Sequence, residues 1–136
     1  MRQEFYIETI PQPQMRPKFA RINGHVTAYD PAKCKNYKQD IKMQVLSKNH
    51  CMMEGPLTMV IEFHMMRPKA HYGKKGLKDN APVWHQSTPD LDNMIKAVKD
   101  SLKGIVWKDD SQVCNLMAQK KYAEVPGILI TIQNTQ

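Results

Sequence analysis

The sequence predicts a single compact α+β domain in which helices pack on a largely antiparallel β-sheet. The chain has 136 residues, enough for one domain, and no repeat, low-complexity tract or linker divides it. Segments with alternating polarity, typical of strands, are interspersed with two segments whose apolar residues recur every three or four positions, as in helices. The order strand, hairpin, helix, strand, long loop, helix, strand, strand fits a mixed α/β arrangement. We therefore expect residues 1–136 to form one domain.

The first segments of the chain predict a strand followed by a hairpin. Residues 4–10 have the composition of a strand, which Pro11 and Pro13 would end. Asn-Gly is a strong turn signal, and Asn23-Gly24 separates two short segments, residues 18–22 and 25–29. These two segments are therefore expected to pair as an antiparallel hairpin.

Two helices are expected, one before and one after the strand at residues 57–65 in the sequence. Asp30 would cap the first helix and Pro31 would be its first residue, and the helix should fade over residues 47–49. Gly104 is placed to end the second helix. The predicted apolar stripes are Cys34, Tyr37, Ile41 and Val45 on the first helix and Leu91, Ile95, Val98 and Leu102 on the second.

The remaining strands are predicted from alternation and from turn residues. Residues 57–65 alternate between apolar and polar side chains with a period of two, the pattern of a half-buried strand. Residues 113–122 and 128–133 read as two further strands, which Pro126-Gly127 separates. These segments complete the sheet on which the helices pack.

Composition indicates a cytoplasmic protein with a polyanionic partner. The formal net charge is +7, and no apolar run approaches the roughly 20 residues needed to span a membrane. Charges at Arg2, Glu4 and Glu8 fall where a signal peptide needs its apolar stretch. The three cysteines form no C-x-x-C pair, and their odd number argues against a disulfide scaffold. We expect a reduced protein that binds neither a membrane nor an organic cofactor.

A basic segment over residues 67–78 is a candidate contact for a phosphodiester backbone. It contains glycine and no acidic residue. Such a stretch is typical of an exposed loop that lies along nucleic acid, although a solvated loop without a partner has the same composition. Its basic side chains are Arg67, Lys69, Lys74, Lys75 and Lys78.

Acidic residues and a lysine are concentrated in residues 89–112. Asp90 and Asp92 are two positions apart, so both carboxylates would point the same way in an extended segment at the start of the second helix. Lys96 follows Asp92 by four residues and would lie on the same helical face. After Gly104 the chain would bring back a second acidic pair, Asp109 and Asp110. We expect three carboxylates and one ammonium group in one pocket.

Such a pocket favours a hard cation. Clustered carboxylates repel one another unless a cation compensates them, and oxygen ligands suit Mg²⁺. A Mg²⁺ site beside a DNA-binding surface suits phosphodiester hydrolysis, in which a nearby lysine can hold the phosphate or orient water. The alternative is structural: Asp92 and Lys96 form an ordinary helical ion pair, and Asp109-Asp110 is a plain turn.

The motif P-D-L-D-N-x-x-K, followed by D-x-L-x-G and W-x-D-D-x-Q-V, resembles the RusA family of Holliday junction resolvases, which is common in bacteria and their prophages. The likeness extends to residues 16–18 and 120–122 and so covers most of the chain. The residues that carry the motif are Pro89, Asp90, Leu91, Asp92, Asn93, Lys96, Asp100, Leu102, Gly104, Trp107, Asp109, Asp110, Gln112 and Val113.

The resemblance implies a Mg²⁺-dependent homodimer that cuts four-way DNA junctions by paired nicks, in DNA recombination and repair. The family's metal-binding aspartates fall on Asp90, Asp92 and Asp110, and its catalytic lysine falls on Lys96; the choice of Asp110 over Asp109 rests on the resemblance alone. The alternatives are a broader flap or fork nuclease and a non-catalytic nucleic-acid-binding module. The residues expected to contact DNA are Arg16, Lys18, Arg67, Lys69, Lys74 and Lys75.

Overall fold

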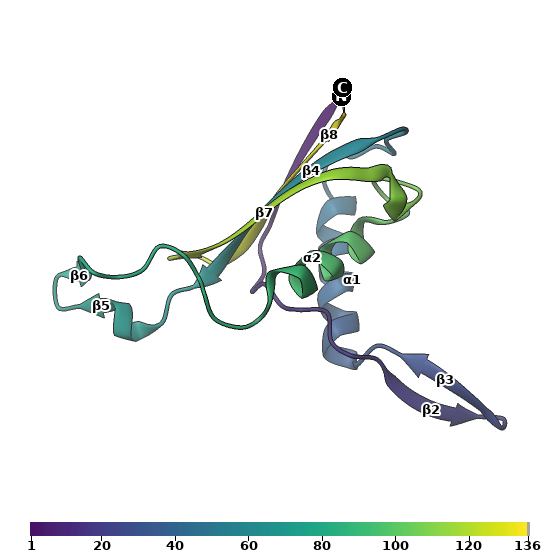
Figure 1. Cartoon of the computed structure of the whole chain (residues 1–136), viewed down its shortest axis with the longest axis horizontal. Coiled ribbons are helices and arrows are strands. Elements are labelled where there is room, and N and C mark those ends of the chain that lie inside the picture. The colour runs from purple at the N-terminus through teal and green to yellow at the C-terminus, as the bar shows by residue number, and fades with distance from the viewer. Residues whose placement is uncertain (136) are drawn as a thin grey trace.

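The centre of the computed structural model, which describes residues 1–135, is a four-stranded sheet (Figure 1). Its strand order is β1-β8-β4-β7. β8 pairs antiparallel with both β1 and β4, whereas β4 and β7 are parallel. The prediction of an α+β domain with a largely antiparallel sheet is therefore confirmed. The four strands are β1 (Arg2–Ile7), β4 (Leu57–Met66), β7 (Val113–Ala123) and β8 (Gly127–Asn134).

Two helices, α1 (Ala32–Leu46) and α2 (Leu91–Leu102), lie on the same side of this sheet (Figure 1). The core fills the space between them and the strands, because every second residue of β4 from Leu57 to Met65 is buried. The predicted stripe of α1 is buried completely. Within residues 1–135, neither helix nor any other has the length and apolar character needed to cross a membrane.

Three local predictions are corrected by tertiary contacts. β1 ends at Ile7 rather than at residue 10, because the Glu8 amide leaves the sheet and donates to the side chain of Gln44. Pro31 is the N-cap of α1 rather than its first residue, and the carboxylate of Asp30 accepts hydrogen bonds from other side chains instead of capping the helix.

The buried face of α2 is also rotated from the predicted stripe. Leu91 and Ile95 are only partly buried and pack at the edge of the core, while Val98 and Leu102 are fully buried as expected. The face of α2 that packs into the core includes small residues. The fully buried residues of α2 are Met94, Ala97, Val98, Ser101 and Leu102.

Two arms project from this body in different directions (Figure 1). One is the predicted hairpin of β2 (Lys18–Ile22) and β3 (His25–Tyr29), in which Asn23 and Gly24 have φ values of 51° and 78°, as a tight hairpin turn requires. The other is the basic segment after β4. It contains a 3₁₀ turn, η1 (Lys69–His71), and a small ribbon of β5 (Tyr72–Gly73) and β6 (Gly76–Leu77).

Candidate active site

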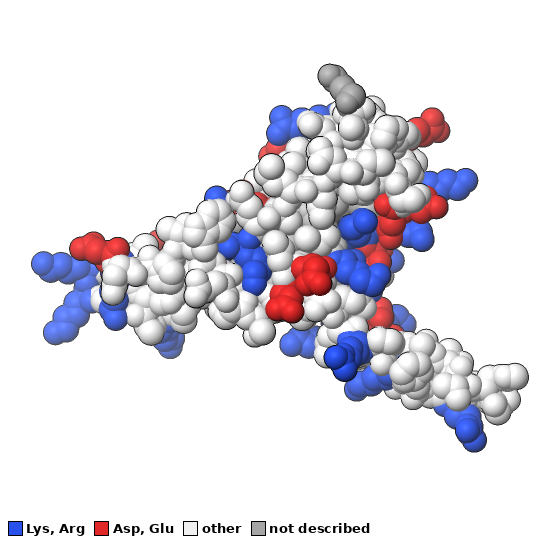
Figure 2. Space-filling view, in the orientation of Figure 1, with Lys and Arg blue, Asp and Glu red and all other residues white. Residues whose placement is uncertain are grey.

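A cavity of about 250 Å³ lies on the face of α2 that points away from the core. Positions 92, 96 and 99 recur at helical spacing and therefore share this face. Figure 2 shows acidic side chains at the middle of the visible surface over α2, with Lys and Arg side chains on either side. The residues that line the cavity are Asp92, Ile95, Lys96, Lys99, Asp100 and Asp110.

Asp110 reaches the cavity from a turn that follows α2. Gly104, with φ of 84°, reverses the chain, and its amide donates to the carbonyl of Trp107 at 2.7 Å. The Trp107 ring is fully buried, and its indole Nε1 donates to Oδ1 of Asp110 at 2.8 Å. A core side chain thus fixes the orientation of this carboxylate.

Asp109 has a structural role that differs from that of Asp110. It is the N-cap of the 3₁₀ turn η2 (Asp110–Gln112), where its carboxylate accepts from the Ser111 amide at 3.1 Å and its own amide donates to the side chain of Gln112. Hydrogen bonds from Ser111 lower the pKa of Asp109. The structure thus distinguishes the two adjacent acids, because Asp110 lines the cavity and Asp109 stabilises a turn.

Asp90 does not line the same cavity as Asp92, contrary to the expectation of one shared pocket. Asp90 is the extended N-cap of α2, with φ −70° and ψ 142°, whereas Asp92 is already in the first helical turn. The backbone from Asp90 to Asp92 is therefore not the continuous strand along which both carboxylates would point the same way. Asp90 lines a neighbouring cavity of about 420 Å³ together with Pro13, Gln14, Thr88, Pro89 and Asn93.

The carboxylates of the cavity are suitable ligands for a hard cation, but they do not form a complete coordination shell by themselves. Asp92 and Asp110 offer the oxygen ligands that Mg²⁺ prefers. Across residues 1–135, however, no three His, Cys, Asp or Glu side chains are grouped as a metal site. Mg²⁺ is commonly bound by one or two carboxylates, with water and substrate phosphate completing its shell. The donor set on this cavity fits that pattern.

Lys96 pairs with Asp100 rather than with Asp92. Its Nζ lies 3.7 Å from Oδ1 of Asp100, and its side chain is 64% exposed. The second oxygen of Asp100 accepts from Nζ of Lys38 on α1 at 3.0 Å, and Lys38 also bonds Asp30 at 3.0 Å. Asp100 is therefore shared between two ammonium groups.

Lys38 is a residue that the sequence interpretation missed. Burial opposes its charge, but hydrogen bonds to Asp100 and Asp30 outweigh that effect and raise the pKa of Lys38. It joins the end of β3, helix α1 and the cavity on α2. No local pattern indicates this contact, because 62 residues separate Lys38 from Asp100.

Lys120 of β7 holds the segment that leads into Asp90. Its Nζ donates to the carbonyls of Ser87 and Pro89, at 2.7 and 2.6 Å. The sequence indicates Lys120 only through the likeness over residues 120–122. Its position shows that a basic residue near an acidic site can orient the backbone instead of binding substrate.

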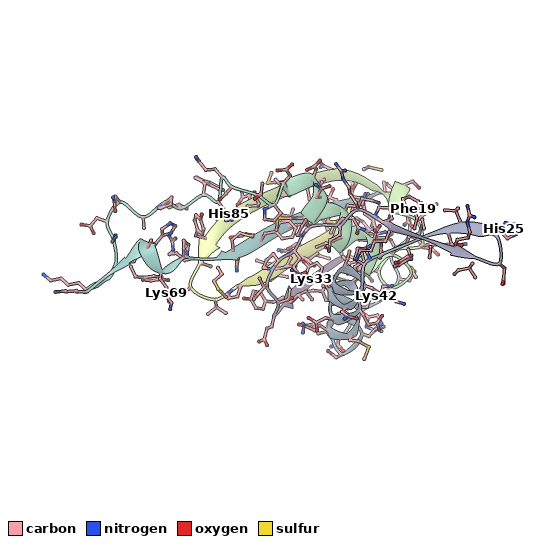
Figure 3. The ribbon with its side chains drawn as sticks, turned by 90° about the horizontal axis from the view of Figure 1, so that it is seen from below. Phe19, His25, Lys33, Lys42, Lys69 and His85 are labelled. Carbon is pink, nitrogen blue, oxygen red and sulfur yellow. The ribbon has the colours of Figure 1, made fainter. Side chains whose placement is uncertain are left out.

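The basic residues expected to contact DNA lie on the two arms. Figure 2 shows Lys and Arg side chains along both, and Figure 3 shows Lys69 on the arm opposite the hairpin. Arg67 differs, because it is half-buried and donates to the Pro82 carbonyl at 2.7 Å. It holds its loop in place. The predicted contacts that are exposed are Arg16, Lys18, Lys69, Lys74 and Lys75.

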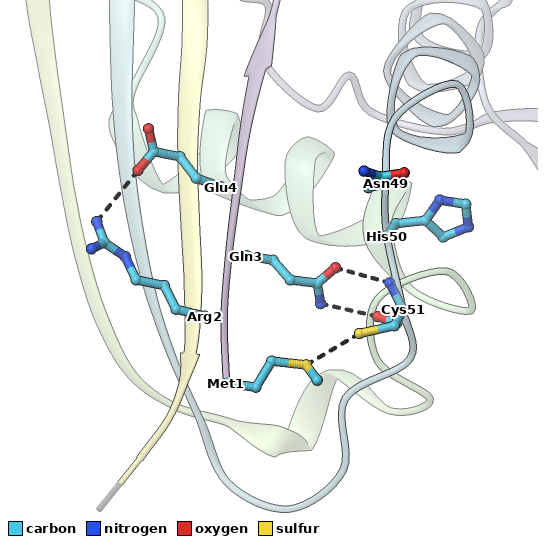
Figure 4. Close-up of a pocket in the computed structure, with 7 residues that line it drawn as sticks. All are labelled: Met1, Arg2, Gln3, Glu4, Asn49, His50 and Cys51. Atoms are coloured by element: carbon cyan, nitrogen blue, oxygen red, sulfur yellow. Dashed lines mark hydrogen bonds and ion pairs between the residues drawn. The ribbon is translucent and has the colours of Figure 1, made fainter.

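A third hollow, of about 410 Å³, lies beside β1 and the segment after α1 (Figure 4). Several of its polar groups bond to one another. The Gln3 side chain donates to the Cys51 carbonyl and accepts from the Cys51 amide, and Arg2 pairs with Glu4 at 3.3 Å. These contacts fasten the chain to the edge of β1 and do not resemble a reactive site.

Comparison with known proteins relates the whole chain to one family. The family model described as "Endodeoxyribonuclease RusA" matches residues 8–133. The chain is 34% identical over 135 residues to "Uncharacterized protein YqaN" of Bacillus subtilis (strain 168), covering 96% of this chain and 94% of that protein. It is 26% identical over 132 residues to "Crossover junction endodeoxyribonuclease rusA" of Lactococcus phage r1t, covering 95% and 94% respectively. The chain belongs to the RusA family of endodeoxyribonucleases.

Proposed function

We propose that this protein is a Mg²⁺-dependent endodeoxyribonuclease that resolves four-way DNA junctions by paired symmetric nicks. The observation that carries the proposal is the cavity shared by Asp92, Lys96 and Asp110 on a chain whose net charge is +7. On a basic protein that attracts phosphate, a local group of carboxylates is suited to bind a cation, which in turn can contact the phosphate. The family and the name of the phage relative support the choice of a junction as substrate.

In this proposal Asp92 and Asp110 hold the cation, and Asp90 on the adjoining cavity is the third ligand. When bound, Mg²⁺ would polarise the scissile phosphate, activate water and neutralise charge on the leaving oxygen. Lys96 binds a phosphate oxygen or orients the attacking water. Trp107 keeps the Asp110 carboxylate in position through its indole hydrogen bond. The protein uses no organic cofactor.

The remaining parts of the proposal concern how DNA is held. The exposed lysines and arginines of the two arms contact the backbones of the duplex arms. Because a four-way junction has near-twofold symmetry, a homodimer would present two equivalent active sites to two equivalent strands. We place this activity in the cytoplasm, in recombination and repair of DNA, with residues 1–136 acting as one nuclease domain.

The test is cleavage of a synthetic four-way junction with mapped nick positions, with and without Mg²⁺. Symmetric nicks that require Mg²⁺ would support the proposal. Linear duplex, flap and fork substrates run in parallel identify a broader nuclease, and binding without any cleavage identifies a non-catalytic module.

Asp90 has its own test, because it lies on the adjoining cavity. Asp90→Asn should raise the Mg²⁺ concentration that gives half-maximal cleavage. An unchanged Mg²⁺ dependence would remove Asp90 from the ligand set while leaving the assignment of Asp92 and Asp110 intact.

A further inference from the structure

The β2–β3 hairpin exposes large apolar side chains on a ribbon that forms its own two-stranded sheet. Nine of its ten strand residues are exposed. Phe19 and Val26 are 68% and 66% exposed. A lone two-stranded hairpin is only marginally stable in water, and apolar surface gathered on one indicates a binding partner.

Each face of the hairpin carries both apolar and basic side chains. Phe19 is opposite Ala28 in the ladder, and Arg21 is opposite Val26. Side chains two apart on a strand share a face, so these four residues form one surface. The other face carries Lys18, Ala20 and Ile22, which lie opposite Tyr29, Thr27 and His25. Its aromatic side chain, Tyr29, is 47% exposed and so less exposed than Phe19. The first face combines an aromatic ring, an aliphatic side chain and a guanidinium group.

The charge of the hairpin decides which partner fits that face. Residues 15–29 contain Arg16, Lys18 and Arg21 but no Asp or Glu. A second copy of the chain would meet this hairpin with an equally basic one, and like charges in contact are unfavourable. A polyanion meets it with attraction. Nucleic acid is the partner that combines negative charge with flat apolar surfaces.

DNA exposes such flat surfaces only where base stacking is interrupted. In a continuous duplex, neighbouring pairs cover the faces of each base. At the branch point of a junction, some faces lose their neighbours and can stack on an aromatic side chain. Apolar side chains of DNA-bending proteins enter interrupted stacks in the same way.

We propose that the Phe19–Val26 face of the hairpin stacks on bases at the branch point of junction DNA, while Arg21 contacts a neighbouring phosphate. The inference rests on the proposed junction substrate and adds the surface that distinguishes branched from linear DNA. Figure 3 shows how far the hairpin extends from the body, with His25 at its tip and Phe19 nearer its base.

The base of the hairpin is tied to the helix that carries the cavity. The backbone amide of Gln14 donates to the backbone carbonyl of Asn93 in α2 at 2.9 Å. Lys38 joins Asp30, directly after β3, to Asp100 of α2. The hairpin therefore holds a defined position relative to the cavity. A branch point placed against Phe19 would determine which phosphate lies near Asp92.

The experiment measures the affinity of the full-length protein for a four-way junction and for linear duplex of the same sequence, in EDTA. Phe19→Ala should weaken junction binding roughly tenfold or more and change duplex binding less than about twofold. Phe19→Trp should retain the preference for the junction. Ile22→Ala, an exposed apolar change on the opposite face, is the matched control and should alter neither affinity.

Two binding results would overturn the inference: equal losses of affinity for both substrates in Phe19→Ala, or no loss for either. A fall in oligomeric mass for Phe19→Ala, measured by sedimentation, would assign the face to a second copy and would also overturn it. These outcomes are separate from failure of the proposed function, which would show as a wild-type protein that does not nick junctions. Circular dichroism of each variant verifies that the body of the protein remains folded.

Discussion

Replacing Lys96 by alanine separates a catalytic role from a structural one. The side chain of Lys96 is 64% exposed, and it forms an ion pair with Asp100 at 3.7 Å. An exposed pair of this kind on a helix contributes about 0.3–0.5 kcal/mol. Asp100 also keeps its shorter contact with Lys38 at 3.0 Å. Lys96→Ala should therefore lower the free energy of unfolding by only a few tenths of a kcal/mol.

The expected effect on cleavage is much larger. A group that stabilises charge in the transition state typically accounts for about 10²–10³-fold in rate when it is removed. Arginine at position 96 should restore activity only in part, because a planar guanidinium group does not reproduce a compact ammonium. A catalytic role and a structural role of Lys96 therefore predict cleavage rates for Lys96→Ala that are easily distinguished.

The assay is single-turnover cleavage of a four-way junction with Mg²⁺ titrated to saturation, with urea unfolding run alongside. Lys103→Ala is the matched control, because it removes the same charge from the exposed C-cap of the same helix. A near-normal rate for Lys96→Ala would refute the catalytic assignment. Recovery of the full rate by excess Mg²⁺ alone would show instead that Lys96 affects metal affinity.

The other predictions test the proposed ligand Asp92, the basic arm and the half-buried Lys38. Asp92→Asn should abolish nicking but leave junction binding in EDTA unchanged or tighter, because it removes a proposed ligand and one negative charge; equal loss of both in parallel assays would indicate a structural role. Lys74→Ala with Lys75→Ala should flatten the slope of log K against log salt by about 0.9 for each duplex phosphate that the lysines no longer neutralise, and an unchanged slope would mean a solvated loop. Because the folded-state pKa of Lys38 is raised above its ordinary value of 10.5, its stabilisation is complete below that pH and disappears as pH rises through the folded pKa. The difference in unfolding free energy between wild type and Lys38→Met should therefore shrink at alkaline pH, and a constant difference in urea titrations at pH values on both sides of 10.5 would contradict this.

Local patterns were sufficient to locate β2, β3 and β4, because their signals do not depend on distant residues, whereas the end of β1 depends on the contact of Glu8 with Gln44. The alternation along residues 57–65 and the Asn23-Gly24 turn each specify a backbone conformation by themselves. The start of α1 was displaced because Asp30 is used by Lys38, a contact that a capping rule does not include. The buried face of α2 was displaced because the helix presents Ala97 and Ser101 to a crowded core.

The candidate site was harder to predict than the strands, because the positions of its side chains depend on tertiary contacts. Asp109 and Asp110 are chemically identical neighbours, and only the positions of Ser111 and the Trp107 indole distinguish them. Asp90 lies before the first helical turn and Asp92 lies within it, and sequence patterns locate such a boundary to within a few residues at best.

The distribution of charge on the molecule indicates how cation and DNA would depend on each other. The exposed lysines and arginines on the arms attract a phosphate backbone over distances near the Debye length, about 8 Å at physiological salt. A phosphate that approaches the cavity itself meets two lysines, Lys96 and Lys99, which attract it, and a larger number of carboxylates, which repel it: Asp92, Asp100 and Asp110. A cation held by Asp92 and Asp110 would turn that repulsion into attraction. Since one or two carboxylates bind Mg²⁺ weakly without phosphate oxygens, cation and scissile phosphate would each favour binding of the other. We therefore expect the arms to bind DNA without the cation and the cavity to engage the phosphate only together with it.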